Sequence, residues 1–231
     1  MTDRVIVALD LETADDAVKM AEQIAPVFPF FKIGILLFTQ AGPGLVKEVL
    51  RHGKVFLDLK FYDIPSIVSE AAYQAAQLGI SLLTLHASGG SEMMKRSAAR
   101  VSGTQVGLLG VTVLTSFDDL GEFGISRSIP EQVDALANLS HAAGLSGIVC
   151  SPAELAALRV RFARPFLLVT PGIRGAGDEK GDQKRTASPV DALNAGADYI
   201  VIGRPIVAAP DPLAAASAIA ESIIHHKSTK D

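Results

Sequence analysis

The chain has 231 residues, 48% of them hydrophobic and 20% charged, which suits one large globular domain or two small ones and excludes disorder as the dominant state. Lysine and arginine number 21 and aspartate and glutamate 25, so the formal net charge is −4, and no basic stripe is present that could follow a nucleic-acid backbone. The single Cys150 excludes an internal disulfide and fits a reducing compartment.

The first apolar run, at 5–9, stops at Asp10 and is too short for a signal peptide. No other run approaches the roughly 20 apolar residues that a membrane helix requires. The sequence therefore predicts a cytoplasmic protein whose partners include neither membranes nor nucleic acid.

Short runs of β-branched and aliphatic residues recur along the chain. Each run is almost continuously apolar rather than alternating, which is typical of parallel strands covered on both faces. The predicted strands lie at 5–9, 30–34, 55–59, 81–86, 106–114, 147–150, 166–169 and 199–203.

Segments with helical spacing separate these runs, and several begin with a cap and a first-turn proline. The predicted helices lie at 14–25, 44–51, 65–78, 91–101, 131–143, 152–162, 189–195 and 212–225. Strands alternating with helices, without a linker-like tract, predict an α/β fold, a single (β/α)8 (TIM) barrel domain over residues 1–231. A doubly wound open sheet is the alternative, disfavoured because no GxGxxG turn follows the first strand.

In such a barrel, catalytic groups lie at the carboxyl ends of the strands. Polar residues gather at these positions in the sequence: Asp10, Lys32, Asp58, Lys60, Asp63, His86, Thr115, Ser116, Arg174 and Arg204, the last directly after Gly203. We therefore expect the functional site at this rim of the barrel.

Asp58 and Lys60 are two residues apart in an apolar strand, so both side chains are expected to point into the barrel. Because isolated buried charges are costly, we expect them to form an alternating network with Asp10, Lys32 and Asp63. A lysine held between carboxylates keeps its proton, which makes Lys60 a candidate general acid. A purely structural ion-pair plug at the barrel mouth is the alternative.

The segment 170–188 is rich in glycine and charge and has no helical or strand period, so we interpret it as a lid. After the last predicted strand, Gly203 permits close backbone approach and Arg204 supplies a bidentate donor at the start of a helix. Barrels often bind phosphate there, which predicts a phosphorylated small-molecule substrate. A plain surface loop followed by a helix cap is the alternative.

Two other residues at strand ends are expected to have smaller roles. We interpret His86 as a structural histidine and Cys150 as a buried thiol, because the sequence places no base beside it. Metal binding would need several carboxylates without lysine partners, and the sequence shows no such cluster, so no metal is expected.

The string DLKFYDIP at 58–65 resembles the D-x-K-x-x-D signature of the orotidine 5′-phosphate decarboxylase family. The similarity covers nearly the whole chain, with VALD at 7–10, HASGG at 86–90, VTVLTS at 111–116, VTPGIR at 169–174, GDQKR at 181–185 and VIGRPI at 201–206 in the family's order. The resemblance implies a carboxy-lyase that converts orotidine 5′-monophosphate to uridine 5′-monophosphate without metal or cofactor, the final step of de novo pyrimidine biosynthesis.

The resemblance also implies a role for each site residue. Asp10 and Lys32 would hold the ribose hydroxyls, Asp58 would lie against the reacting carboxylate, and Lys60 would protonate carbon 6 of the pyrimidine. Asp63 would reach into the site of a second subunit, which makes a homodimer necessary for activity. Thr115 and Ser116 would line the pyrimidine side, and Arg174, Gln183, Gly203 and Arg204 would bind the phosphate, with 175–184 closing as a lid.

The sequence departs from the family pattern at one position. The pattern DIPxT has a threonine where this chain has Ile67. That threonine normally contributes a hydroxyl to the ribose-phosphate site of the second subunit. We therefore expect substrate binding to be weaker by about 0.5–1.5 kcal/mol unless Ser66 or a water substitutes.

Two other functions stay open on the sequence alone. The hexulose-phosphate synthase and ketogulonate-phosphate decarboxylase group resembles this chain in fold but uses magnesium, with a glutamate ligand where this chain has Lys32, and lacks the long loop. A non-catalytic barrel that binds a phosphorylated ligand is the second alternative, and a turnover assay separates it from both enzymes.

Overall fold

The structure is a computed structural model that describes residues 2–174 and 186–228. Eight parallel strands close into a barrel in the order β1 to β8. The strands are β1 (Val5–Ala8), β2 (Phe30–Gly34), β3 (Lys54–Phe61), β4 (Leu82–His86), β5 (Gly107–Val111), β6 (Gly147–Val149), β7 (Leu167–Thr170) and β8 (Tyr199–Ile202). The predicted barrel is thereby confirmed, and the open sheet is excluded.

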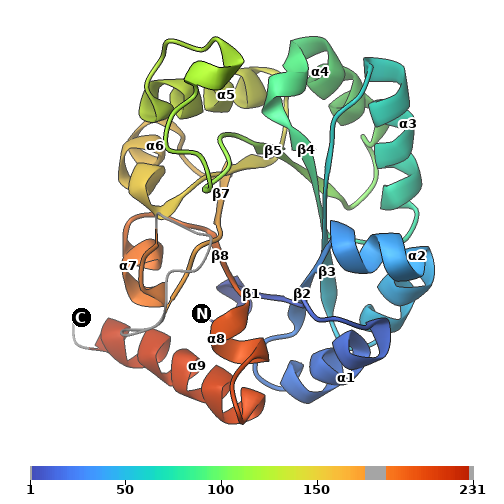
Figure 1. The fold of residues 1–231 in the computed structure, drawn as a ribbon, viewed down its shortest axis with the longest axis vertical. Helices are drawn as coiled ribbons and strands as arrows, with labels where there is room; N and C mark the ends of the chain where they lie inside the picture. The colour runs from blue at the N-terminus through green and yellow to red at the C-terminus, as the bar shows by residue number, and fades with distance from the viewer. Residues whose placement is uncertain (1, 175–185, 229–231) are drawn as a thin grey trace.

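Helices form an outer ring around the strands (Figure 1). They are α1 (Ala14–Ile24), α2 (Ile35–Val49), α3 (Pro65–Ala76), α4 (Gly90–Arg100), α5 (Ile129–Ala142), α6 (Leu155–Arg161), α7 (Pro189–Asn194), α8 (Arg204–Val207) and α9 (Pro212–Ser228). Within the described residues, no helix is long and apolar enough to cross a membrane. The cytoplasmic location expected from the sequence stays a prediction.

Two apolar clusters hold the fold together. The larger one lies between the strands and the helices, and the smaller one fills the inside of the barrel. The inner cluster consists of Ile6, Ala8, Phe30, Phe56, Leu82, Leu109, Val169 and Val201. Because side chains alternate across a strand, the next inward positions beyond Phe30, Phe56 and Leu82 hold Lys32, Asp58 and Thr84. The apolar floor is thus followed by a polar layer.

Helix α2 begins earlier than the prediction of a helix over 44–51. It starts at Ile35, directly after β2, and contains a kink at Gly42, whose φ of 60° and ψ of −154° are not helical. Pro43 follows as the first residue of the second half, a position where its missing N–H costs nothing. The glycine and proline that resemble a helix stop therefore divide one helix instead.

Strand β3 also differs from its predicted range of 55–59, because it continues to Phe61. Its pairing with β4 is interrupted between Leu57 and Phe61, where the register shifts. The irregular stretch contains Asp58 and Lys60, so the regular hydrogen bonds between β3 and β4 do not by themselves determine the backbone conformation there.

Candidate active site

A pocket of about 510 Å³ lies at the carboxyl ends of the strands, a volume typical of small-molecule sites. Its walls come from the ends of β1, β2, β3, β5 and β6 and from the segments after β5, β7 and β8. Most of the site residues predicted from the sequence line it: Asp10, Lys32, Asp58, Lys60, Thr115, Arg174, Gly203 and Arg204.

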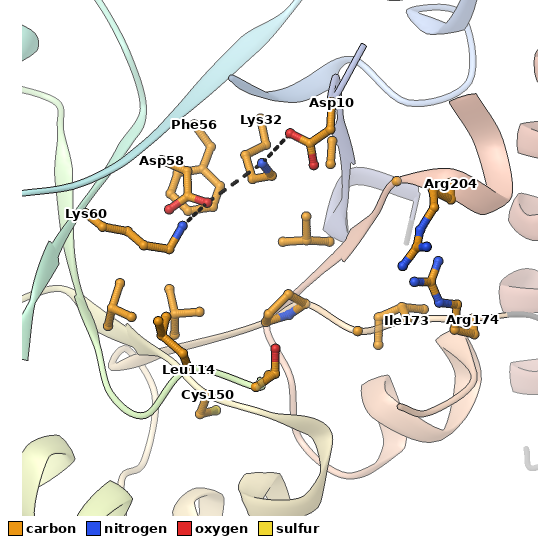
Figure 2. A pocket seen from close by; sticks show the side chains of 18 of the residues that line it. Asp10, Lys32, Phe56, Asp58, Lys60, Leu114, Cys150, Ile173, Arg174 and Arg204 are labelled. Carbon is orange, nitrogen blue, oxygen red and sulfur yellow. Dashed lines mark hydrogen bonds and ion pairs between the residues drawn. The ribbon is translucent and has the colours of Figure 1, made fainter. Parts of the chain in front are cut away.

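Four charged side chains of alternating sign form a continuous chain along one wall (Figure 2). Lys32 Nζ donates to Asp10 Oδ1 at 3.0 Å and lies 3.7 Å from Asp58 Oδ2. Lys60 Nζ donates to the same Asp58 oxygen at 2.8 Å. The predicted network is therefore present for Asp10, Lys32, Asp58 and Lys60, and it lines an open pocket rather than filling it.

Asp58 is the centre of this chain, with only 13% of its side chain exposed. Burial alone would raise its pKa, but the charges of Lys32 and Lys60 and hydrogen bonds from Lys60 and Thr84 outweigh this effect. The pKa of Asp58 is therefore held below the ordinary aspartate value. The wall of the pocket carries a fixed negative charge beside the Lys60 ammonium group.

The backbone of β3 places Lys60 in the pocket through an unusual conformation. Its φ of 51° lies in the left-handed region, and Lys60 is the one non-glycine residue with positive φ in the described chain. Such a conformation is costly for a residue with a Cβ atom and persists only where its surroundings hold it. One such contact is the hydrogen bond from the Lys60 backbone N–H to Thr84 Oγ1, at 2.9 Å.

Two arginines lie across the pocket from the four charged side chains of the first wall. Figure 2 shows the guanidinium groups of Arg174 and Arg204 turned toward one another. Arg174 follows β7, and Arg204 begins α8 directly after Gly203. Two convergent guanidinium groups provide fork-shaped donors suited to a phosphate or carboxylate group.

The two described ends of the predicted lid are hydrogen-bonded to one another, and the first of them, at Gly172 and Arg174, lines the pocket. Arg174 N donates to the Ala187 carbonyl at 3.0 Å, and Ala187 N donates to the Gly172 carbonyl at 3.3 Å. Gln183 and most of the predicted lid at 170–188 fall on residues 175–185, outside the described residues. Their proposed contact with phosphate stays a prediction.

Two predicted site residues do not line the pocket of this single chain. Asp63 is exposed, and its Oδ1 accepts a hydrogen bond from Ile64 N at 2.6 Å instead of joining the charged network. Ser116 is exposed beside Thr115 but is not part of the pocket wall. Ile67 is 53% exposed on the first turn of α3.

Cys150 and His86 were expected to be a buried thiol and a structural histidine, and the structure adds the contacts that each makes. Cys150 is 2% exposed and contributes to the pocket wall, as a buried thiol would. The His86 ring packs edge-on against Tyr62, with ring centres 5.9 Å apart. Burial and the charge of Lys60 lower the pKa of His86, and the charge of Asp58 opposes them only in part.

One residue in contact with the charged chain was missed by the sequence analysis. Thr84 lies on β4 two residues before His86, is fully buried, and bonds to both Asp58 and the Lys60 backbone. The signal that could have found it is its inward register, since it shares a face of the strand with Leu82 and His86.

Within the described residues, no group of three or more histidine, cysteine, aspartate or glutamate side chains is arranged to hold a metal ion. The two carboxylates in the pocket, Asp10 and Asp58, both face ammonium groups. The chemistry that these residues can perform themselves is electrostatic stabilisation and proton donation from Lys60.

Comparisons with known proteins agree with this geometry. A model of the orotidine 5′-phosphate decarboxylase / HUMPS family matches residues 3–219. The orotidine 5′-phosphate decarboxylase of Moorella thermoacetica is 46% identical over 232 residues, covering 96% of this chain and 92% of the relative. That of an Anaeromyxobacter species is 48% identical over 225 residues, covering 96% and 99%. The crystal structure of orotidine 5′-phosphate decarboxylase from Lactobacillus acidophilus superimposes with a TM-score of 0.84 at 37% identity, covering 96% and 99%.

Proposed function

The chain belongs to the orotidine 5′-phosphate decarboxylase / HUMPS family, and we propose that it decarboxylates orotidine 5′-monophosphate to uridine 5′-monophosphate. The observation that carries this proposal is the chain Asp10–Lys32–Asp58–Lys60 on one wall of a pocket whose other side presents Arg174 and Arg204. This arrangement supports a binding mode in which the carboxylate-bearing ring lies at the first wall and the phosphate at the second.

In this proposal the reaction uses protein side chains alone, without a metal ion or cofactor. The bond between C6 of the pyrimidine and its carboxylate breaks, the electron pair stays on C6, and carbon dioxide leaves. The C6 carbanion lies in the ring plane and is not delocalised, so the site must stabilise it electrostatically. Lys60 Nζ then donates its proton to C6, which gives uridine 5′-monophosphate, and the lysine regains a proton from solvent.

Asp58 contributes a charge that is already fixed before the substrate binds. Its negative charge lies against the position of the substrate carboxylate and disfavours that group more than the neutral carbon dioxide that leaves. The same carboxylate holds Lys60 Nζ at 2.8 Å, so the proton donor stays beside C6. Binding of the remote phosphate by Arg174, Gly203 and Arg204 supplies the energy that brings the two carboxylates together.

Independence from a metal ion is supported by the partners of the two pocket carboxylates. Lys32 lies 3.0 Å from Asp10 and 3.7 Å from Asp58, so a cation already occupies the space between them. A divalent ion placed there would be repelled by this ammonium group. This arrangement favours the decarboxylation of a nucleotide over a magnesium-dependent reaction of a sugar phosphate.

Activity in a homodimer is the second part of the proposal. Tyr62, Ile64 and Ile67 follow β3, Ile35 and Leu36 follow the neighbouring strand β2, and each side chain is more than half exposed. Exposed apolar side chains gathered near a site are typical of a surface that another protein covers. A second copy docked there would bring Asp63 of one protomer to the pocket of the other.

The test compares two substrates with the chelator-treated protein. Orotidine 5′-monophosphate and a keto-sugar phosphate are each incubated with the protein, with and without added magnesium, and the products are identified by mass spectrometry. We expect uridine 5′-monophosphate and carbon dioxide at a rate that magnesium does not change. If the protein converts only the sugar phosphate, and only when magnesium is added, the proposal is wrong. The chain would then act as a magnesium-dependent enzyme on sugar phosphates.

A further inference from the structure

A single threonine hydroxyl lies beneath the charged chain, in the interior of the barrel. Thr84 is on β4, fully buried, and positioned above the apolar floor to which Leu82 belongs. It does not line the pocket, so it is out of reach of a bound substrate. Its effect on the reaction must pass through the residues that it contacts.

The hydroxyl of Thr84 makes two hydrogen bonds whose directions are fixed by chemistry. The Lys60 backbone N–H donates to Thr84 Oγ1 at 2.9 Å. Thr84 Oγ1 lies 2.9 Å from Asp58 Oδ1, and because an ionised carboxylate only accepts, the single hydroxyl proton is donated to Asp58. One hydroxyl therefore joins the backbone of the proton donor to the carboxylate beside it.

Both contacts lie where the regular strand pairing fails. The register between β3 and β4 is interrupted between Leu57 and Phe61, and Lys60 within this stretch has a φ of 51°. The Lys60 N–H has the side chain of Thr84 as its partner on β4 instead of a backbone carbonyl. The hydroxyl thus replaces a bond of the sheet and holds a conformation that is unfavourable for lysine.

The second hydrogen bond of Thr84 fixes the orientation of the Asp58 carboxylate, which is the partner of the Lys60 ammonium group. With Oδ1 held by Thr84, the second carboxylate oxygen, Oδ2, faces Lys60 Nζ at 2.8 Å and Lys32 Nζ at 3.7 Å. Rotation of the carboxylate would break these contacts and move the proton donor.

We propose that Thr84 is a positioning residue for the decarboxylation, whose hydroxyl sets the relative geometry of the Asp58 carboxylate and the Lys60 ammonium group. The inference rests on the function proposed above. A shift of about 1 Å in a reacting group can lower the rate about 100-fold, so the loss of this hydroxyl should affect the chemical step rather than substrate binding.

The test replaces the hydroxyl while keeping the shape of the side chain. In Thr84→Val we expect kcat to fall about 10- to 100-fold with KM changed less than about threefold. Thr84→Ser keeps the hydroxyl, and we expect it to restore kcat to within about threefold of the wild-type value. Thr112→Val is the matched control, because the buried Thr112 donates to the Val149 carbonyl at 2.8 Å instead of to a residue of the charged chain.

A second readout does not depend on the substrate. The exchange of the Lys60 amide proton with deuterium, followed by NMR of nitrogen-labelled protein, should be faster in Thr84→Val and in Thr84→Ala than in wild type and Thr84→Ser. Thr84→Ala provides the same removal with room for a water, in case Thr84→Val does not fold. If the wild-type protein fails to decarboxylate the nucleotide, the proposed function is wrong, and the amide exchange still tests the contact.

Three results would overturn the proposal. They are a kcat in Thr84→Val equal to that of Thr112→Val, a loss of kcat in Thr84→Ser as large as that in Thr84→Val, and a Lys60 amide whose exchange is unchanged when the hydroxyl is removed. A fall in kcat that is reversed by serine, with KM retained and faster exchange at Lys60, supports it.

Discussion

Lys60 is the residue on which the proposed chemistry depends most directly. Its Nζ lies 2.8 Å from Asp58 in the pocket, on a backbone with positive φ. In Lys60→Ala we expect turnover to fall at least about 1,000-fold, because the general acid is lost, while uridine 5′-monophosphate still binds through the arginines. Turnover is measured from the loss of substrate absorbance and binding by calorimetry.

The matched control for this change is Lys54→Ala. Lys54 is an exposed lysine at the other end of β3, far along the strand from the pocket. We expect this variant to keep the wild-type rate. Retained turnover in Lys60→Ala would show that another group donates the proton.

Ile67 tests the one departure from the family pattern. In Ile67→Thr, a hydroxyl is restored at an exposed position on the first turn of α3. We expect KM to fall about 2- to 10-fold, which corresponds to one added hydrogen bond to the substrate of the neighbouring protomer. Ile67→Val, which has nearly the same shape as threonine without the hydroxyl, should leave KM at the wild-type value. Equal KM values for the two variants would remove the hydroxyl as the explanation.

Much of the site was predictable at the residue level, and the limits have physical causes. Asp58, Lys60 and Lys32 stand out because charges inside apolar strands need partners or a function. Thr84 could not be identified in this way, because threonine is common in strands and costs little to bury. Its importance depends on the left-handed backbone at Lys60, which the sequence pattern does not reveal.

At the level of elements, the strands were easier to predict than the start of α2. Continuous apolar runs identified all eight strands, since a strand covered on both faces leaves few polar positions. Gly42 and Pro43 hid the first half of α2, because the same pair of residues can end a helix or only kink it. The packing of the helix against the barrel decides between these outcomes.

The kink at Gly42 carries a prediction of its own. Its φ of 60° with ψ of −154° lies in a region that is essentially restricted to glycine, while a Cβ atom there would meet no neighbour. We expect Gly42→Ala to lower the free energy of unfolding by about 1–3 kcal/mol, as a purely conformational cost. Urea denaturation measures this change.

Gly44→Ala is the control for that substitution. Gly44 also has open space around its Cβ position, but its φ is negative and it lies in the helical part of α2. We expect alanine there to raise the free energy of unfolding by about 0.5–1 kcal/mol. Equal effects of the two substitutions would show that alanine at position 42 has no conformational cost.

At the scale of the whole molecule, the pocket of one chain lacks Asp63. That carboxylate points to Ile64 N in the described chain and is surrounded in sequence by exposed apolar residues. If each site combines Lys60 of one protomer with Asp63 of the other, two inactive variants can restore one another. A refolded 1:1 mixture of Lys60→Ala and Asp63→Ala should regain about one quarter of wild-type activity, because half of the dimers are mixed and each has one intact site.

The control for the mixture is Lys60→Ala with Asp58→Asn. Asp58 and Lys60 contact one another within a single chain, so no mixed dimer of these variants contains an intact site. We expect this second mixture to stay inactive. If sedimentation shows that dimers have formed and both mixtures are still inactive, Asp63 does not act across the interface.

The most direct test of the central claim is the ultraviolet absorbance of orotidine 5′-monophosphate after mixing with the wild-type protein in the presence of a chelator. The charged chain Asp10–Lys32–Asp58–Lys60 predicts a rapid loss of absorbance that added magnesium does not change. No loss of absorbance, or a loss that requires magnesium, would contradict decarboxylation by protein side chains without a metal ion.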